Sequence, residues 1–222
     1  INADSSFRIA EEAQERGHSL FYYSPDKLAF QEGKLTARGH KFTVQRVENT
    51  PAILEPEEEA ALSDFDVIWL RQDPPFDMHY ITTTHLLDLV HPQTLVVYDP
   101  FWVRNFPEKL LVLNFPDLTP PTTIARDLET IRAFKVKHED VILKPLYGNG
   151  GAGVFRLEEG DGNLSSLHEL FTGFSREPLI VQKFLPDVSD GDKRVILVDG
   201  EPVGAINRVP AKGETRSNMH VG

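Results

Sequence analysis

A lysine and a cluster of glycines lie close together in the middle of the chain and could hold a phosphate group. The segment reads VILKPLYGNGGAGVFRL, with Lys144 ahead of the glycines and Gly148 to Gly153 matching the pattern G-x-G-x-x-G. A lysine supplies positive charge for a phosphate, and glycine amides approach it without hindrance from side chains. The segment therefore indicates a phosphate site, with a glycine-rich turn beside a surface lysine as the alternative.

The residues that flank the glycines discriminate between the known phosphate-binding loops. In a dinucleotide-binding fold the glycines open a helix, and the helix N-terminus receives the pyrophosphate. Here Val154 to Leu157 read Val-Phe-Arg-Leu, which predicts a strand, so the loop joins two strands. No Lys-Ser/Thr pair follows the glycines, as a Walker A loop requires, and a kinase-type lysine would come after them. The pattern favours a nucleoside triphosphate and argues against NAD.

A second group of charged residues follows an apolar segment in the first half of the chain. Phe65 to Leu70 is typical of a strand buried on both faces of a parallel sheet, and it ends in Arg71-Gln72-Asp73-Pro74-Pro75. Open α/β sheets bind ligands at the carboxyl ends of such strands, and the two prolines stiffen this corner. Arg71 and Asp73 are therefore candidate ligand-binding residues, with a surface turn and local ion pair as the alternative.

Two arginines lie on the strands of a hairpin expected over residues 194–208, which turns at Asp199-Gly200. A two-residue loop would place Arg194 and Arg208 on opposite faces. A three-residue loop bulged at Gly200 would place them on one face, as a clamp for carboxylates with Asp192 nearby. We predict the shared face, and two independent surface arginines are the alternative.

Other polar residues carry weaker signals. Lys109 lies on a short predicted helix, where a lone lysine is usually solvated. The eight histidines show no spacing typical of zinc ligands. Asp187, Asp190 and Asp192 could attract a cation, but their position in a loop favours a solvated turn.

The elements that must position these residues form two patterns. Over residues 1–105, helices expected at 7–16 and 83–90 alternate with strands at 18–23, 65–70 and 94–98, which predicts an open α/β domain. Residues 24–60 look turn-rich, with Glu57-Glu58-Glu59 as a helix start. From 106, we expect helices at 107–115, 128–137 and 164–171 and strands at 122–125, 141–146, 154–157 and 179–184. This pattern predicts a small α+β lid over residues 106–181.

The composition excludes several classes of protein. A net charge of −11 over 222 residues argues against binding to nucleic acid by phosphate neutralisation. No apolar run is long enough to span a bilayer, and the absence of cysteine excludes disulfides and thiolate metal sites. We expect a soluble cytoplasmic protein that binds small molecules and neither nucleic acid nor membranes.

Six stretches together resemble bacterial glutathione synthetase, an enzyme of the ATP-grasp superfamily. They read DSSF, RQDPPFD, PEKL, ILKPLYGNGGAGVFRL, QKFLPDVSDGDKRVILVDGEPVGAINRVP and GETRSN. The resemblance runs across nearly the whole chain. It implies an ADP-forming carboxylate–amine ligase that joins γ-glutamylcysteine to glycine through an acyl phosphate, with Mg²⁺ or Mn²⁺ as the ion that accompanies ATP, and a homo-oligomer.

The resemblance also assigns roles to individual residues. Lys144, Arg194 and Arg208 would be catalytic. The nucleotide-binding set would be Lys109, Lys144, Gly148, Asn149, Gly150, Gly151 and Gly153, followed by Gln182, Lys183, Phe184 and Leu185 beside the adenine. The substrate-binding set would be Ser6, Arg71, Asp73, Arg194, Arg208 and Arg216.

The resemblance predicts an N-terminal α/β substrate domain over residues 1–105, an ATP-grasp lid over 106–181 and the start of a C-terminal ATP-grasp lobe over 182–222. Because the family continues past GETRSN to its metal ligands, we expect the chain to be truncated or incomplete, and no metal ligand is assigned. The alternatives are another ATP-grasp carboxylate–amine ligase, or a nucleotide-binding fragment without catalysis.

Overall fold

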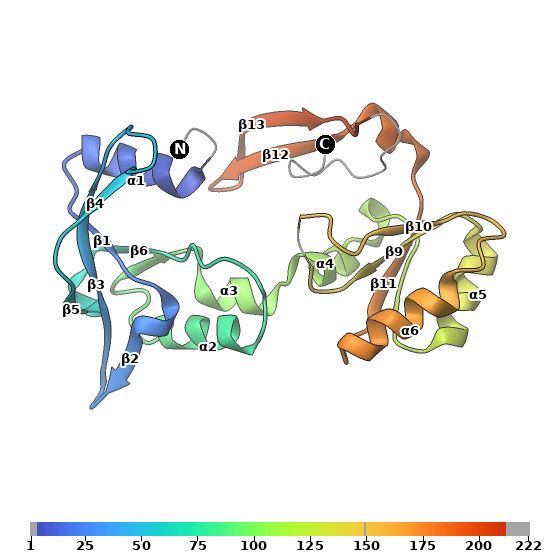
Figure 1. Ribbon diagram of the computed structural model, residues 1–222, viewed down its shortest axis with the longest axis horizontal. Coiled ribbons are helices and arrows are strands. Elements are labelled where there is room, and N and C mark those ends of the chain that lie inside the picture. Colours follow the sequence, from blue (N-terminus) through green and yellow to red (C-terminus); the bar gives the residue numbers. More distant parts are fainter. Residues whose placement is uncertain (1–3, 149, 212–222) are drawn as a thin grey trace. The chain divides into compact units, whose positions relative to one another are not determined.

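The computed structural model describes residues 4–148 and 150–211. The chain divides into two compact units, Ile1–Pro107 and Glu108–Gly222, which are described separately below (Figure 1). None of the helices in the described ranges has the length and apolar character needed to cross a membrane.

The first unit contains an antiparallel sheet built on one long strand, β3 (Lys34–Val44), which pairs with β1 (Leu20–Tyr22), β2 (Leu28–Gln31), β4 (Ala52–Leu54) and β5 (Glu58–Ala61). Gly39 is required in β3 because a Cβ there would lie 2.2 Å from the carbonyl oxygen of Tyr22. The prediction of a turn-rich segment over residues 24–60 was therefore wrong.

The predicted helix start at Glu57-Glu58-Glu59 is also wrong, and charge pairing explains why. Glu58 begins β5, where its carboxylate lies 3.0 Å from Lys41 Nζ on the neighbouring strand. The carboxylate of Glu57, directly before β5, lies 2.8 Å from the guanidinium of Arg38 on β3. Cross-strand pairs of opposite charge stabilise a sheet, so these glutamates are compatible with a strand.

The remainder of the first unit is a parallel pair of strands with three helices: β6 (Val67–Trp69), β7 (Leu95–Val97), α1 (Ser5–Glu15), α2 (Met78–Leu87) and α3 (Pro100–Asn105). Short 3₁₀ turns occur at Pro25–Lys27 and Leu62–Asp64. Ile68 is buried, but Val67 and Trp69 are 43% and 46% exposed, so β6 is buried on one face only. The prediction of a strand buried on both faces was wrong. The expected mixed α/β unit is present, but as two sheets rather than one open sheet.

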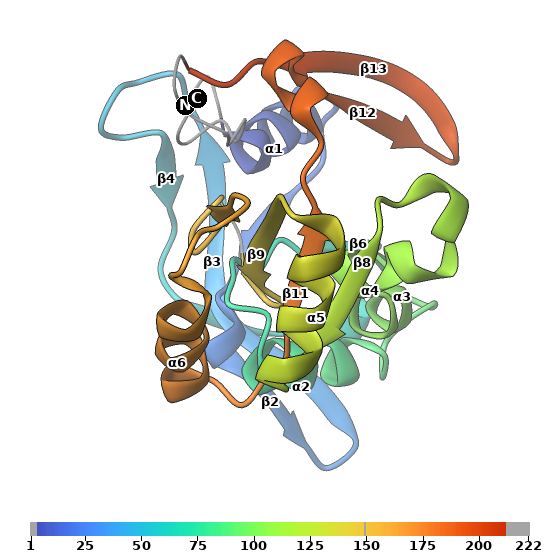
Figure 2. The same cartoon turned by 90° about the vertical axis from the view of Figure 1, so that its right-hand side faces the viewer.

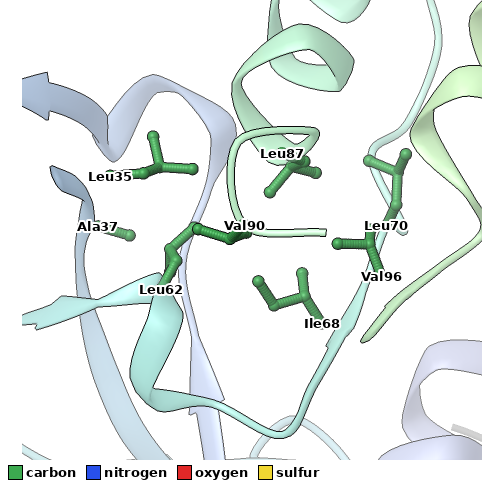
Figure 3. Close-up of a cluster of buried hydrophobic side chains, with 8 residues drawn as sticks. All are labelled: Leu35, Ala37, Leu62, Ile68, Leu70, Leu87, Val90 and Val96. Carbon is green, nitrogen blue, oxygen red and sulfur yellow. The ribbon is translucent and has the colours of Figure 1, made fainter. Parts of the chain in front are cut away.

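The core of the first unit joins the two sheets. Buried side chains from β3, β6, β7, α2 and the segments beside them point toward one another in Figure 3: Leu35, Ala37, Leu62, Ile68, Leu70, Leu87, Val90 and Val96. Burying such apolar side chains is the main source of stability in a domain of this size. This core fixes the carboxyl ends of β6 and β7, where the predicted ligand-binding corner lies.

The second unit contains a four-stranded antiparallel sheet in the order β10-β9-β11-β8. Its elements are β8 (Thr122–Ala125), β9 (Val141–Pro145), β10 (Phe155–Leu157), β11 (Leu179–Lys183), α5 (Leu128–His138) and α6 (Leu164–Phe174). Both helices cover one face of the sheet (Figures 1 and 2). The core beneath them consists of Ile131, Val141, Leu143, Leu157, Leu164, Leu179 and Val181. Each of these elements lies within a few residues of its predicted position.

Shorter elements complete the second unit: α4 (Glu108–Leu111), 3₁₀ turns at Val112–Asn114, Pro116–Leu118 and Pro186–Asp190, and a hairpin of β12 (Asp192–Val198) and β13 (Glu201–Arg208). The predicted boundary between residues 181 and 182 falls inside β11. A separate third domain that begins there remains a prediction.

Candidate active site

The glycine loop joins two antiparallel strands, as its flanking residues predicted. β9 leads into it, and β10 returns beside β9 with Phe155 opposite Leu143. Gly150, Gly151 and Gly153 have φ values of 61°, 80° and 70°, which L side chains rarely adopt. No helix begins at Gly153, so the geometry required for a dinucleotide-binding turn is absent from this described segment. Asn149 lies outside the described residues.

Lys144 lies on the sheet face that α5 and α6 leave uncovered. The register pairs it with Ile180, and Ile142, Gln182 and Arg156 lie on the same face, because paired residues of antiparallel strands share a face. Burial lowers the pKa of Lys144, and the nearby charge of Lys109 lowers it further. No described carboxylate lies within ion-pair distance of the Lys144 ammonium. This half-buried cation lies at the end of the strand that enters the glycine loop.

Lys109 lies beside the same loop, although the two lysines are 35 positions apart in the sequence. Its ammonium donates to the carbonyl oxygens of Pro145 and Gly148, each at 2.9 Å. Burial lowers the pKa of Lys109, and Glu108 opposes that shift. The structure therefore brings together two of the predicted phosphate-binding cations, and gives Lys109 an additional contact with the loop backbone.

Gln182 and Lys183 are the last residues of β11, and Phe184 and Leu185 follow them directly. Gln182 lies on the open face of the sheet. Gln182 Nε2 donates to Thr122 Oγ1 at 2.9 Å. The amides of Lys183 and Phe184 donate to the carbonyl oxygens of Pro121 and Asp140, each at 2.9 Å. The amide of Leu185 makes no hydrogen bond to a described residue, so it is the amide of these three that could meet an adenine.

Arg156 is a residue of this region that sequence reasoning missed. Its guanidinium donates to both carboxylate oxygens of Asp140, at 3.0 and 2.6 Å, and lies 3.9 Å from the ring centroid of Phe184. An open cavity of about 410 Å³ adjoins this stack, lined by Lys137, His138, Glu139, Asp140, Arg156, Lys183, Phe184 and Pro186. The alternation of residues along β10 was the signal that could have placed Arg156 on the face of Lys144.

The late hairpin places Arg194 and Arg208 on one face, but not for the predicted reason. Asp199 and Gly200 form a two-residue turn with φ values of 51° and 83°. The register then shifts, because Ile196 pairs with Gly204 but Leu197 pairs with Pro202. One extra residue therefore lies on β13 at this point. Because of this bulge, rather than one at Gly200, the two arginines lie on the same face of the hairpin.

The two arginines differ in their surroundings. Arg208 donates from Nε and Nη2 to the two carboxylate oxygens of Asp192, at 2.8 and 2.5 Å. The contact with Asp192 raises the pKa of Arg208. Arg194 is exposed and lies opposite Ile206. It is two residues along β12 from Asp192 and therefore on the same face. A carboxylate bound by both arginines would therefore compete with Asp192 for Arg208.

In the first unit, the structure brings together residues that are 65 positions apart. Arg71 Nε donates to Ser6 Oγ at 3.1 Å. Ser6 lies in the first turn of α1, where Asp4 caps the helix by accepting from the amides of Ser6 and Phe7. Asp73 is exposed at the same corner, and no ion pair joins it to Arg71 in the described part of the chain. The alternative of a local ion pair is therefore not supported.

The remaining predictions concern Arg216 and a possible metal site. Arg216 lies outside the described residues. Within residues 4–148 and 150–211, no group of three or more His, Cys, Asp or Glu side chains could hold a metal ion. Asp187 and Asp190 lie in a 3₁₀ turn, and Asp192 pairs with Arg208. These three carboxylates therefore do not form a cation-binding site in the described part of the chain.

This architecture is that of the ATP-grasp proteins. The chain is similar in structure to a RimK domain ATP-grasp protein from Sphaerobacter thermophilus, with a TM-score of 0.63 and 19% identity over 93% of this chain and 70% of that one. It is also similar to the ATP-grasp ligase PsnB, solved with Mg and ADP, with a TM-score of 0.54, 20% identity and the same coverage. At these identities the likeness shows the fold alone.

Sequence comparison gives the family. The model of the prokaryotic glutathione synthetase N-terminal domain matches residues 1–104, and that of its ATP-grasp domain matches residues 108–222. The chain belongs to the prokaryotic glutathione synthetase family. It is 56% identical over its whole length to the glutathione synthetases of Brucella melitensis and Mesorhizobium japonicum, and 42% identical to that of Vibrio cholerae. It spans 70–71% of the length of these relatives.

Proposed function

We propose that this chain binds ATP on the open face of the second unit's sheet and uses it to join γ-glutamylcysteine to glycine. The observation that carries the proposal is the pair of half-buried lysines, Lys109 and Lys144, at the base of a glycine hairpin. Neither has a described carboxylate at ion-pair distance, and a buried cation without a counter-charge is costly unless a ligand provides one. The triphosphate of ATP supplies that charge. Membership of the family supports the assignment.

The roles of the residues follow from their positions. Lys144 meets the phosphates from β9, and the amides of Gly148 to Gly153 cover them. Lys109 exchanges its carbonyl contacts for phosphate oxygens when ATP enters. Residues 182–185 lie beside the adenine, with the amide of Leu185 as the free donor. Mg²⁺ arrives with the nucleotide and offsets the phosphate charge. No described residue is assigned to it.

In the reaction we propose, a cysteinyl carboxylate oxygen attacks the γ-phosphorus of ATP, and the bond to the β-phosphate oxygen breaks to give ADP. The neutral amine of glycine then attacks the acyl phosphate carbon, and phosphate leaves as the amide bond forms and the amine loses a proton. Arg194 and Arg208 stabilise the carboxylate and the developing acyl phosphate. Such catalysis is mainly positioning and electrostatic stabilisation.

On the first unit, Ser6, Arg71 and Asp73 bind the peptide substrate, and Arg216 also contributes to substrate binding. The cytoplasm as the site of the reaction and a homo-oligomeric assembly are parts of the same proposal. They are supported only by the family resemblance and the acidic, cysteine-free composition.

An isotope experiment on the full chain tests the reaction. The cysteinyl carboxylate of γ-glutamylcysteine is labelled with ¹⁸O and incubated with ATP, Mg²⁺ and glycine. We expect one ¹⁸O atom in the phosphate released for each glutathione formed. Turnover with other carboxylates but not with γ-glutamylcysteine would indicate a different ATP-grasp ligase. ATP binding without any phosphate release would indicate a non-catalytic nucleotide-binding chain.

A further inference from the structure

The guanidinium of Arg156 is held in place by two carboxylates. Its Nε and Nη2 donate to the two oxygens of Asp140 at 3.0 and 2.6 Å, and its Nη1 lies 3.2 Å from a carboxylate oxygen of Glu158. A two-point contact of this kind fixes the plane of a guanidinium as well as its place. Asp140 directly precedes β9 and Glu158 directly follows β10, so the ends of two paired strands orient this side chain.

The oriented guanidinium lies against the aromatic ring of Phe184. The Cζ atom of Arg156 is 3.9 Å from the ring centroid, well inside the range of about 6 Å over which a cation is attracted to a ring face. The Phe184 amide also donates to the Asp140 carbonyl oxygen at 2.9 Å. Asp140 therefore holds the Phe184 segment twice, once through its own backbone and once through the guanidinium that its side chain orients.

The exposure of these groups favours a role in binding over a purely structural one. The side chains of Arg156 and Asp140 are each 32% exposed, and ion pairs at such positions contribute little to stability. Both residues, together with Phe184, line the open cavity of about 410 Å³. The pair therefore does more to shape the wall of this cavity than to stabilise the unit.

Arg156 is not available to bind phosphate in the way that Lys144 is. All three of its guanidinium nitrogens contact carboxylate oxygens, so its charge is already compensated. It lies on the same open face as Lys144, because it pairs with Ile142, two residues before that lysine. Whatever Arg156 contributes to a ligand on this face must therefore pass through the ring that it contacts.

The ring belongs to the segment that we place beside the adenine. Phe184 is followed directly by Leu185, whose amide makes no hydrogen bond to a described residue. Lys183 pairs with Val141, three residues before Lys144, so this segment lies about 10 Å along the sheet from the phosphate-binding lysine. A ribose and its phosphate chain can span that separation.

We propose that Arg156 is a positioning residue for the base of the nucleotide. Its guanidinium, oriented by Asp140, holds the ring of Phe184 and so fixes the direction in which the Leu185 amide meets the base. This inference rests on the proposed function, because it concerns the same ATP site. It goes beyond that function in predicting that the base and the phosphates of ATP depend on different arginine and lysine side chains.

Two ligands separate the base from the phosphates in calorimetry on the full chain: ATP, and inorganic tripolyphosphate, which has no base. Arg156→Met keeps an apolar stem against Phe184 and removes the cation. We expect it to weaken ATP binding by about three- to thirty-fold, the effect of one cation–π contact, and to leave tripolyphosphate binding unchanged. Arg156→Lys should recover part of the loss, since it keeps the charge but not the two-point contact with Asp140.

Arg132→Met is the matched control, because Arg132 on α5 also forms an ion pair, with Glu129 at 2.7 Å. It should change neither affinity. Phe184→Leu removes the ring itself and should lower the ratio of ATP affinity to tripolyphosphate affinity at least as much as Arg156→Met does. This ratio is the deciding readout, because damage to the fold would weaken both ligands together.

The outcomes distinguish this inference from the proposed function. A wild-type ratio in Arg156→Met or in Phe184→Leu would overturn the inference and leave the proposed function standing. An equal fall of the ratio in Arg132→Met would also overturn it, since the effect would not depend on the contact with Phe184. Should Arg156→Met weaken both ligands, the ratios in Arg156→Lys and Phe184→Leu decide. If the wild-type chain binds neither ligand, the proposed function fails and this inference fails with it.

Discussion

At the scale of single residues, the candidate nucleotide site depends on charges that the protein leaves uncompensated. Lys144 is half-buried, and burial disfavours its charged form, yet no described acidic side chain pairs with it. Lys27 and Lys41 differ in this respect, because each has a glutamate carboxylate at 3.0–3.1 Å. A half-buried cation with a lowered pKa and no acidic partner is a candidate functional-site residue.

We predict that Lys144→Ala weakens ATP binding by about 1.5–3 kcal/mol, the usual contribution of a charge-assisted hydrogen bond. Lys144→Arg should recover little of this loss, because a planar guanidinium differs from an ammonium in shape and hydration. Calorimetry with ATP measures the change. Lys135→Ala is the control, since Lys135 donates to the Glu158 carbonyl oxygen on the helix-covered side of the unit. Equal ATP affinity in wild type and Lys144→Ala would contradict the assignment.

A second prediction concerns protons. Burial, and then the charge of Lys109, place the pKa of Lys144 below the usual lysine value of about 10.4. Phosphate charge favours the ammonium, so ATP raises this pKa. Between the free and bound pKa values, binding takes up a proton, and affinity falls as the pH rises through the pKa of the free protein.

Calorimetry in two alkaline buffers that differ in ionisation enthalpy measures this uptake. Lys144→Met should reduce it, and the remainder belongs to Lys109, whose pKa burial also lowers. A binding enthalpy that does not depend on the buffer would show that neither lysine changes its protonation when ATP binds.

At the scale of elements, the glycine loop depends on close contacts as well as on backbone conformation. A Cβ on Gly153 would lie 3.1 Å from Pro145 Cδ and 3.3 Å from Phe171 Cε1. Phe171 itself packs edge-on against Phe155, with ring centroids 5.9 Å apart. The loop is therefore seated on a proline from β9 and an aromatic ring from α6, and a side chain at Gly153 would displace it.

Gly153 and Gly160 provide a matched pair for testing this. Both have positive φ, 70° and 78°, but a Cβ on Gly160 would meet no atom within 4 Å. We predict that Gly160→Ala costs only the backbone strain of about 1–2 kcal/mol. Gly153→Ala should cost more and also weaken ATP binding. Chemical denaturation and calorimetry measure the two effects. Equal losses of stability with unchanged ATP affinity would show that the packing of the loop against Pro145 and Phe171 does not affect ATP binding.

The elements also show what the sequence could predict. The strands and helices of the second unit were predicted to within a few residues, because Val141, Leu143 and Val181 give one fully buried face. The strands β2 to β5 were missed, because their polar and charged residues are compatible with strands only when charges pair across the sheet. The bulge in the late hairpin could not be placed, since it depends on which residues of two strands pair.

The candidate site divides in the same way. Lys144 and the glycine loop were predicted because they are adjacent in the sequence, and because Lys144 lies in the apolar strand that leads into the loop. The contacts of Lys109 with Pro145 and of Arg156 with Phe184 were not, because they join segments 36 and 28 positions apart. Arg71 and Ser6 were placed together only by family resemblance, and their hydrogen bond is specific to the folded chain.

At the scale of the whole molecule, the chain is two units with separate hydrophobic cores, one around Leu62 and Leu87 and the other around Leu143 and Val181. The family models divide the chain at nearly the same place, between residues 104 and 108. The residues that we assign to ATP within the described chain all belong to the second unit. Those assigned to the peptide substrate are divided between the first unit, with Ser6, Arg71 and Asp73, and the second, with Arg194 and Arg208. ATP should therefore stabilise mainly the second unit, and γ-glutamylcysteine both units.

Hydrogen exchange on the full chain can resolve the two units. A ligand at a hundred times its Kd stabilises the state that binds it by about 2.7 kcal/mol, which slows exchange through global unfolding of that unit by about a hundred-fold. We predict that ATP protects the core amides of residues 108–211 to this extent and those of residues 4–107 much less, while γ-glutamylcysteine protects the core amides of both ranges. Lys144→Ala should remove the protection by ATP, and Arg71→Met should reduce the protection of residues 4–107 by γ-glutamylcysteine. Equal protection of both units by ATP alone would mean that the units unfold as one, and that the separate cores do not confer separate stabilities.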